Sequence, residues 1–159
     1  MTTYRRAEDL YEQLVMQLRG LLRDASPTHD ALLAVCHLLR THVSHYDWVG
    51  VYLRDPGGRD ELVLGPFDGA PTEHTRIPFG TGVCGRAAER AETVLVQDVS
   101  RDPDYQACSL DVKSELVVPI LKEGRFVALI DVDSHTPSAF TDADRTFLEI
   151  VAEMLSAFF

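Results

Sequence analysis

The 159-residue chain has only three cysteines, an odd number that does not fit the disulfide framework of a small secreted domain. It has no uncharged apolar stretch near the ~20 residues that a membrane-spanning helix needs, and its first residues hold no apolar signal core. Basic residues are few, 15 against 25 acidic ones, so the net charge of −10 repels nucleic-acid phosphate and anionic membranes. We therefore expect one cytoplasmic domain, without a nucleic-acid or membrane partner.

Apolar residues at three- and four-residue steps predict helices near both ends of the chain. The first runs from Tyr4 to Leu22, and the second covers 28–43 after the capping signal Ser26-Pro27. A third helix follows Thr141, because Thr141 and Asp144 have the spacing of a capping box. The expected apolar faces are Leu32, Leu33, Cys36, Leu39 and Val43 in the second helix, and Phe147, Ile150, Val151, Met154, Leu155 and Phe158 in the third.

The middle of the chain is patterned for strands. Two hairpins are expected, each with a glycine-containing turn, and a short helix lies between them. The predicted strands cover 48–53, 61–64, 75–78, 93–96, 115–121 and 126–132, and the short helix covers 86–90. This order predicts an α+β fold in which helices pack on an antiparallel sheet. The polar segment 97–113 is a long loop, of the kind that is usually functional or mobile.

Two motifs have a simpler interpretation than the one they suggest first. Gly80-x-Gly82-x-x-Gly85 matches a dinucleotide fingerprint, but no doubly wound α/β pattern follows it, so the glycines are assigned to a tight turn. His42 and His45 have no further metal ligands nearby in the sequence, and no metal site is expected. Cys36 is interpreted as a small apolar residue of the second helix.

The other two cysteines are candidate nucleophiles. Cys84 lies at the start of the short helix, where a helix N-terminus lowers a thiol pKa, and Cys108 lies inside the long loop. Because only the thiolate is strongly nucleophilic, such positions favour redox or nucleophilic chemistry. Spacing alone leaves open that both cysteines are incidental.

Acidic residues form a third feature. Asp131 and Asp133 are two apart on one apolar strand and so share a face, and Glu115 opens the neighbouring strand. Buried carboxylates are costly unless a cation or hydrogen-bond donors satisfy them. One interpretation is that the two aspartates bond turn amides. The other is a pocket for an ammonium group, with at least one carboxyl group held protonated.

Together these segments resemble the GAF fold and, within it, the free methionine-(R)-sulfoxide reductase family. The matching segments are 48–53, 62–69, 76–85 with its Gly-Val-Cys-Gly, Ala107-Cys108, 114–119 and 130–134. The resemblance implies that Cys108 is the catalytic cysteine and Cys84 a second redox cysteine. It also implies a substrate pocket formed by Trp48, Tyr52, Glu115, Asp131 and Asp133, with Trp48 as the aromatic wall for the methyl group.

The resemblance further implies that free L-methionine (R)-S-oxide is reduced through a cysteine sulfenic acid and a disulfide. Thioredoxin with its NADPH system would regenerate the thiols, and no bound cofactor is expected. The family usually has a further cysteine before the Arg-Ile-Pro segment, whereas Thr72 to Arg76 contain no thiol here. The alternative is a non-catalytic GAF domain that binds a small molecule as a sensor.

The expected organisation is a single GAF domain over 1–159. It comprises N-terminal helices (1–43), a sheet with the ligand pocket (46–134) and a C-terminal helix (141–159). The apolar stripes of the terminal helices make a homodimer possible, although burial within one chain would account for them equally well.

Overall fold

A six-stranded antiparallel sheet forms the centre of the computed structural model, which describes residues 2–26, 29–105 and 111–159, with side chains from residue 5 onward. Across the sheet the strand order is β3-β2-β1-β6-β5-β4. The strands are β1 (Trp48–Arg54), β2 (Glu61–Asp68), β3 (Arg76–Pro78), β4 (Val94–Val96), β5 (Ser114–Lys122) and β6 (Arg125–Ser134). The predicted α+β class with an antiparallel sheet is confirmed.

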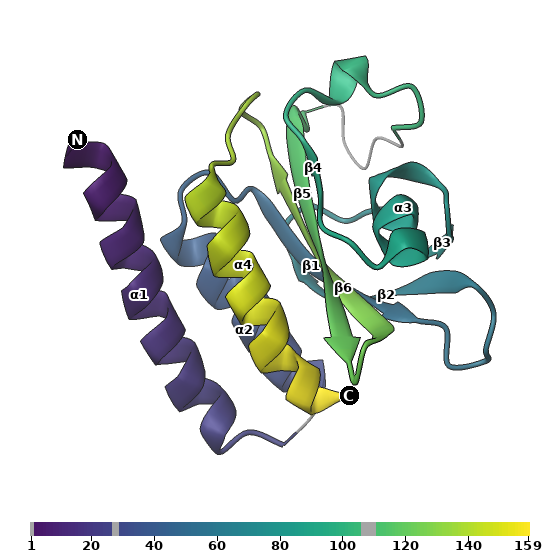
Figure 1. The fold of residues 1–159 in the computed structure, drawn as a ribbon, viewed down its shortest axis with the longest axis horizontal. Coiled ribbons are helices and arrows are strands. Elements are labelled where there is room, and N and C mark those ends of the chain that lie inside the picture. Colours follow the sequence, from purple (N-terminus) through teal and green to yellow (C-terminus); the bar gives the residue numbers. More distant parts are fainter. Residues whose placement is uncertain (1, 27–28, 106–110) are drawn as a thin grey trace.

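The helices divide between the two faces of the sheet (Figure 1). On one face, α2 (His29–His42) and α4 (Asp142–Leu155) pack against the strands, and α1 (Thr2–Arg23) packs on these two helices as an outer layer. The other face carries α3 (Gly82–Arg90), and the short turn η1 (Val99–Arg101) follows β4 on the way to the Arg86–Asp102 ion pair with α3. A second short turn, η2 (Ser156–Phe158), follows α4. We call these two sides the helical face and the α3 face.

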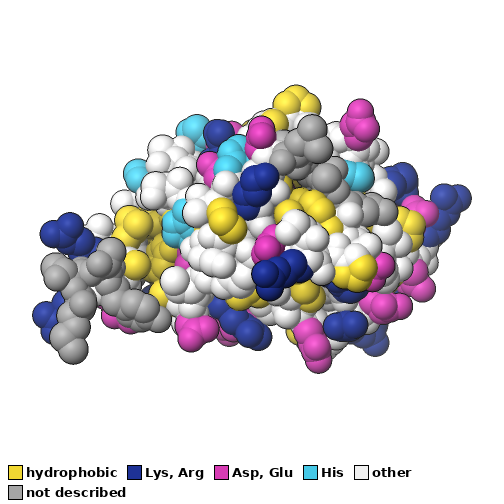
Figure 2. Space-filling model, turned by 90° about the horizontal axis from the view of Figure 1, so that it is seen from above, with side chains coloured by type: hydrophobic (Ala, Val, Ile, Leu, Met, Phe, Trp, Pro, Cys, Tyr) yellow, Lys and Arg dark blue, Asp and Glu magenta, His cyan; other side chains and the backbone are white. Residues whose placement is uncertain are grey.

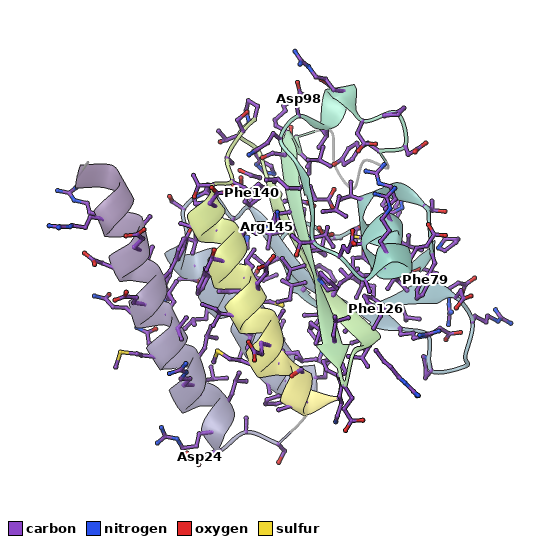
Figure 3. All side chains as sticks on the ribbon, in the orientation of Figure 1. Asp24, Phe79, Asp98, Phe126, Phe140 and Arg145 are labelled. Carbon is purple, nitrogen blue, oxygen red and sulfur yellow. The ribbon has the colours of Figure 1, made fainter. Side chains whose placement is uncertain are left out.

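Because strand residues alternate between faces, the chain buries two separate apolar clusters. The larger cluster joins α1, α2 and α4 to the helical face, and Phe140 lies at its edge near the start of α4 (Figure 3). The smaller cluster lies between the sheet and α3. Phe79 and Phe126 contact each other edge to face in this layer, at the end away from Asp98 (Figure 3). No helix in the described ranges is both long and apolar enough to span a membrane.

Strand register determines which side chains meet on the α3 face. Trp48 of β1 pairs with Asp133 of β6, which in turn pairs with Glu115 of β5. In the next row on this face, Asp131 pairs with Gly50 on one side. The three acidic residues therefore occupy two adjacent rows on the neighbouring strands β5 and β6, on the same face as α3.

Some predicted boundaries and faces are wrong by one position or one turn. The short helix begins at Gly82 instead of 86, so Cys84 lies within its first turn. Leu33 and Ile150 were expected on buried faces but are each 38% exposed, whereas Leu148 is fully buried. Each helical residue turns about 100° from the previous one, so the edge of an apolar face is set by the partner that packs on it.

A buried acid joins the outer helix to the rest of the helical face. Asp144 Oδ1 accepts hydrogen bonds from the hydroxyl groups of Tyr11 and Tyr46, and it lies 2.7 Å from His45 Nε2. Its Oδ2 accepts from the Thr141 amide at 2.8 Å, within the predicted capping box. One carboxylate therefore links α1, the segment before β1 and the start of α4.

Candidate active site

The three acids of β5 and β6 are buried on the α3 face. Asp131 is 0% exposed, Asp133 1% and Glu115 5%. None of the four carboxylate oxygens of Asp131 and Asp133 has a hydrogen-bond partner among the residues that the structure describes. The interpretation that these aspartates bond turn amides is therefore wrong for the described part of the chain, and their burial is costly as long as they stay ionised.

Burial and mutual repulsion favour the neutral forms of these acids. The pKa of Asp133 is raised well above its ordinary value, first by burial and then by the charge of Asp131. Burial also raises the pKa of Asp131, although the nearby Glu115 carboxyl and Cys84 thiol oppose that rise. The expectation that at least one carboxyl group stays protonated fits these directions.

Cys84 lies directly against the acids. Its Sγ is 3.7 Å from Glu115 Oε1, and the residue is only 6% exposed. The pKa of its thiol is raised well above the ordinary value by burial, and then by the charges of Asp131, Glu115 and Asp133. The expected lowering of this pKa by the helix N-terminus is wrong, because the helix end contributes typically 0.3–1 kcal/mol and full burial much more.

The glycines of the Gly80-x-Gly82-x-x-Gly85 motif allow α3 to approach the sheet. Gly80 and Gly82 have φ values of 82° and 64°, which other residues adopt only with strain. A Cβ atom at Gly85 would lie 2.6 Å from the Pro78 carbonyl oxygen, and the Gly80 amide donates to the Gly85 carbonyl at 2.8 Å. The motif therefore serves the close packing that brings Cys84 to the acids, as expected for a tight turn.

Trp48 forms an aromatic wall beside the acids. Its ring stacks on Phe67, with centroids 5.4 Å apart, and its Nε1 donates to the Ala70 carbonyl at 3.0 Å. The indole lies over Gly50, where an added Cβ would come within 2.2 Å of the ring. Sequence reasoning placed Trp48 but missed Gly50, although a glycine inside a strand is a recognised signal of close approach.

Tyr52 has a supporting position. It is fully buried, and its hydroxyl group donates to the His74 carbonyl oxygen at 2.8 Å. The His74 amide in turn donates to Thr72 Oγ1, so the loop before β3 is held from both sides. Tyr52 thus positions His74, a wall residue that sequence reasoning did not single out.

A small cavity remains beside Cys84. Its volume is about 20 Å³, and its lining consists of His74, Ile77, Thr81, Gly82, Val83, Cys84 and Glu115. Such a space holds about one water molecule. The space beside Cys84 is therefore too small for a ligand of amino-acid size in this conformation.

Cys108 lies outside the described residues, so its predicted approach to the acids stays a prediction. The described residues before it are anchored to α3. The Arg86 guanidinium forms a two-pronged ion pair with Asp102, one contact measuring 3.0 Å, and it lies 3.7 Å from an Asp104 oxygen. Both partners of the main pair are largely buried, with 16% of the Arg86 side chain and 10% of the Asp102 side chain exposed.

Cys36 is on the other face of the sheet. It is 1% exposed, its Sγ contacts the Pro66 carbonyl oxygen at 3.7 Å, and burial raises the pKa of its thiol to about 12. Its interpretation as a small buried residue is confirmed.

The fold and this pocket define a GAF domain, and the chain belongs to the GAF domain family, whose match covers residues 27–158. Within that family it is similar to proteins named free methionine-R-sulfoxide reductase. The one from Saccharomyces cerevisiae is 33% identical, over 94% of this chain and 85% of the relative. GAF domain-containing protein A of Dictyostelium discoideum is 38% identical, over 93% and 91% of the two chains.

A solved structure extends this similarity to the coordinates. The X-ray structure of free methionine-R-sulfoxide reductase from Neisseria meningitidis, in complex with its substrate, superposes with a TM-score of 0.89. It is 37% identical and covers 96% of this chain and 89% of its own. The resemblance to the reductase family is therefore confirmed.

Proposed function

We propose that this chain reduces free L-methionine (R)-S-oxide to L-methionine. The observation that carries the proposal is the set of three buried acids, two of them without hydrogen-bond partners among the described residues, beside a thiol and an aromatic wall. The reductase names of relatives with 31–33% identity, and of a substrate complex with 37% identity, support the same activity.

Recognition rests on the substrate's ammonium group. It supplies the donors that Asp131 and Asp133 lack, and one ion pair at 4 Å in a partly dry site contributes roughly 4 kcal/mol before desolvation. The methyl group of the substrate lies against Trp48. A methionine within a protein has no free ammonium group and adds the bulk of its neighbours, so the pocket selects the free amino acid.

The chemistry requires one reactive thiol and one proton relay. The sulfur of Cys108 attacks at the sulfoxide, and the thiol proton passes to the sulfoxide oxygen. The S–O bond of the substrate breaks, the oxygen becomes bonded to the Cys108 sulfur, and the electron pair of the broken bond stays on the methionine sulfur. A neutral carboxyl group of the pocket can pass that proton on. Cys108 thiol plus sulfoxide thus yields cysteine sulfenic acid plus methionine, with all atoms and electrons accounted for.

Recycling assigns a second role to Cys84. Its thiol condenses with the sulfenic acid of Cys108 and releases water, and an external dithiol such as thioredoxin, fed by NADPH, reduces the disulfide. This step needs the two Cα atoms within about 4.4–6.8 Å of each other. Since burial and nearby acids raise the Cys84 pKa, we expect resolution to be slower than sulfoxide reduction.

The separate roles of Cys108 and Cys84 are tested by an assay coupled to NADPH consumption and by a single-turnover assay of methionine formation. We expect Cys108→Ser to abolish methionine formation in both. Cys84→Ser should still form one methionine per chain in the first turnover, but its NADPH consumption should fall about tenfold or more. Cys36→Ser is the matched control and should retain both activities. Full activity of Cys108→Ser would exclude the mechanism, and sulfoxide binding without turnover would favour the sensor.

The organisation follows as part of the same proposal. Residues 1–159 form a single cytoplasmic GAF domain, with the pocket in 46–134, and the terminal helices offer a dimer surface that includes Met16, which is 72% exposed. Light scattering at micromolar concentration tests the homodimer, and a monomeric mass would exclude it.

A further inference from the structure

Three possible ligand atoms for a cation meet on the α3 face. Cys84 Sγ, one carboxylate oxygen of Glu115 and one of Asp131 all lie within 4.8 Å of one another, and all three residues are buried. The Sγ–Oε1 separation is 3.7 Å. For tetrahedral zinc, metal–sulfur bonds of about 2.3 Å and metal–oxygen bonds of about 2.0–2.2 Å place neighbouring ligand atoms about 3.5 Å apart.

A second observation concerns the two aspartates of this region. The four carboxylate oxygens of Asp131 and Asp133 are buried without a hydrogen-bond partner in the described ranges, and Asp133 pairs across the sheet with Glu115. The adjoining cavity of about 20 Å³ is lined by both Cys84 and Glu115. That volume accommodates a single ion or water, whereas an amino acid needs far more space.

We propose that Cys84, Glu115 and Asp131 form a binding site for a thiophilic divalent cation of the zinc class. The thiolate ligand selects zinc or cadmium over magnesium and calcium, which prefer oxygen ligands alone. Asp133 lies beside the ligands, where it can orient Glu115 or complete the coordination.

Metal binding changes the protonation of Cys84 in a balanced way. The thiol loses its proton to solvent as its sulfur bonds the cation, so thiol plus divalent cation gives metal thiolate plus one proton. A coordinated thiol is deprotonated even where a free one is not, because the cation reverses the effect of the surrounding negative charge.

The consequence for activity rests on the proposed function. A bound cation occupies the same acids as the ammonium group of the sulfoxide, and it holds Cys84 away from disulfide formation. The site is therefore a reversible inhibitory site, and substrate and metal compete for it.

Cadmium is the probe, because a cadmium–thiolate bond gives an ultraviolet charge-transfer band. Titration of reduced, metal-free protein should give one band that saturates at one equivalent and resists excess magnesium. Cys84→Ser should lose the band, whereas Cys36→Ser and Cys108→Ser should keep it. Glu115→Gln and Asp131→Asn should each weaken cadmium binding about tenfold or more.

Two results would overturn the site: a band that persists in Cys84→Ser, or unchanged cadmium affinity in both acid variants. Folding is monitored by the melting temperature. Cadmium should raise it in the wild-type chain and in Cys36→Ser but not in Cys84→Ser. If Cys84→Ser does not fold, the cadmium affinity of Glu115→Gln decides whether the site exists, because this variant keeps the thiol and alters one ligand.

Competition separates this inference from the proposed function. Free methionine (R)-sulfoxide should lower the apparent cadmium affinity. A sulfoxide that binds metal-free protein but leaves cadmium binding unchanged would refute the shared site. A sulfoxide that does not bind at all would refute the proposed function, and the cadmium titration would still decide the metal site.

Discussion

The two faces of the sheet each bury aspartate, and they treat it in opposite ways. On the helical face, Asp144 is 1% exposed, and its oxygens accept from Tyr11, Tyr46 and the Thr141 amide and contact His45. On the α3 face, Asp131 and Asp133 are equally buried, yet their oxygens have no partner among the described residues. Burial alone therefore does not distinguish a structural acid from a binding one.

The difference appears in the protonation of the two groups. Hydrogen bonds from His45 and Tyr11 outweigh burial and lower the pKa of Asp144 to about 2. Burial and the charge of Asp131 raise the pKa of Asp133 well above its ordinary value. An acid whose donors come from the fold stabilises it, whereas an acid without them lowers stability until a ligand supplies a positive charge.

The surface adds little to this contrast. Over the face shown in Figure 2, acidic and basic side chains are interspersed, and no extended region of one sign is visible. On this face the acidic side chains are thus not gathered into one patch, whereas Asp131, Asp133 and Glu115 are gathered inside the molecule.

Replacing Asp144 with asparagine tests the structural side of the comparison and should give the largest effect. The amide loses the charge that the donors of Tyr11, Tyr46, His45 and Thr141 share, and it turns its own NH₂ group toward one set of them. We expect the free energy of unfolding to fall by about 3 kcal/mol, since bonds to a charged group contribute about 1.5–3 kcal/mol each and are not additive. Urea unfolding at neutral pH measures this free energy. A loss below about 0.5 kcal/mol would show that the Asp144 hydrogen bonds do not stabilise the helical face.

Lowering the pH removes the charge of Asp144 without changing the sequence, and so tests the same hydrogen-bond network. Because the pKa of Asp144 is about 2 in the folded chain against 3.8 ordinarily, its contribution is fully present above pH 3.8 and is lost as the pH falls through 2. The expected size is about 2 kcal/mol.

Urea unfolding at pH 5 and pH 2 in the wild-type chain and in Asp144→Asn measures this contribution, because the other acids titrate in both. The acid-induced loss should be smaller in the variant by the expected amount. Equal acid-induced losses in the two chains would show that the stability lost at low pH does not come from Asp144.

Local rules were sufficient for much of the fold. Alternation along 126–132 placed Asp131 and Asp133 on one face, and the hairpin turn brought Glu115 to the adjacent strand, as the register confirms. Element order was enough for the antiparallel α+β class. The start of α3 was missed because three glycines weaken a helical pattern that tertiary packing restores.

Features that depend on distant residues were not predictable in the same way. The hydrogen bond from Tyr11 to Asp144 joins residues that are 133 positions apart, and no local sequence pattern predicts such a bond. The pKa of Cys84 was expected to fall from its place in the helix, but it rises because acids from β5 and β6 pack against it. The support of His74 by Tyr52 likewise appears only when β1 and the loop before β3 are seen together.

Asp133→Asn tests the binding side of the comparison and should give the smallest change in stability, with the opposite sign. The amide cannot ionise, so it removes the cost of a buried carboxyl group beside Asp131, and it can donate toward its neighbours. We expect a gain of about 1 kcal/mol in the free energy of unfolding, of the size often found when a functional residue is neutralised. Affinity for free methionine sulfoxide, measured by calorimetry, should fall about tenfold or more as an ammonium partner is lost.

Asp24→Asn is the matched control, because Asp24 is exposed and lies at the end of α1, far from the sheet (Figure 3). It should change neither stability nor affinity beyond about 0.5 kcal/mol. If Asp133→Asn instead destabilised the chain as Asp144→Asn does, the acid would have partners that keep it ionised in the fold. The two faces would then differ only in which donors they use, and the ammonium pocket would lose its physical basis.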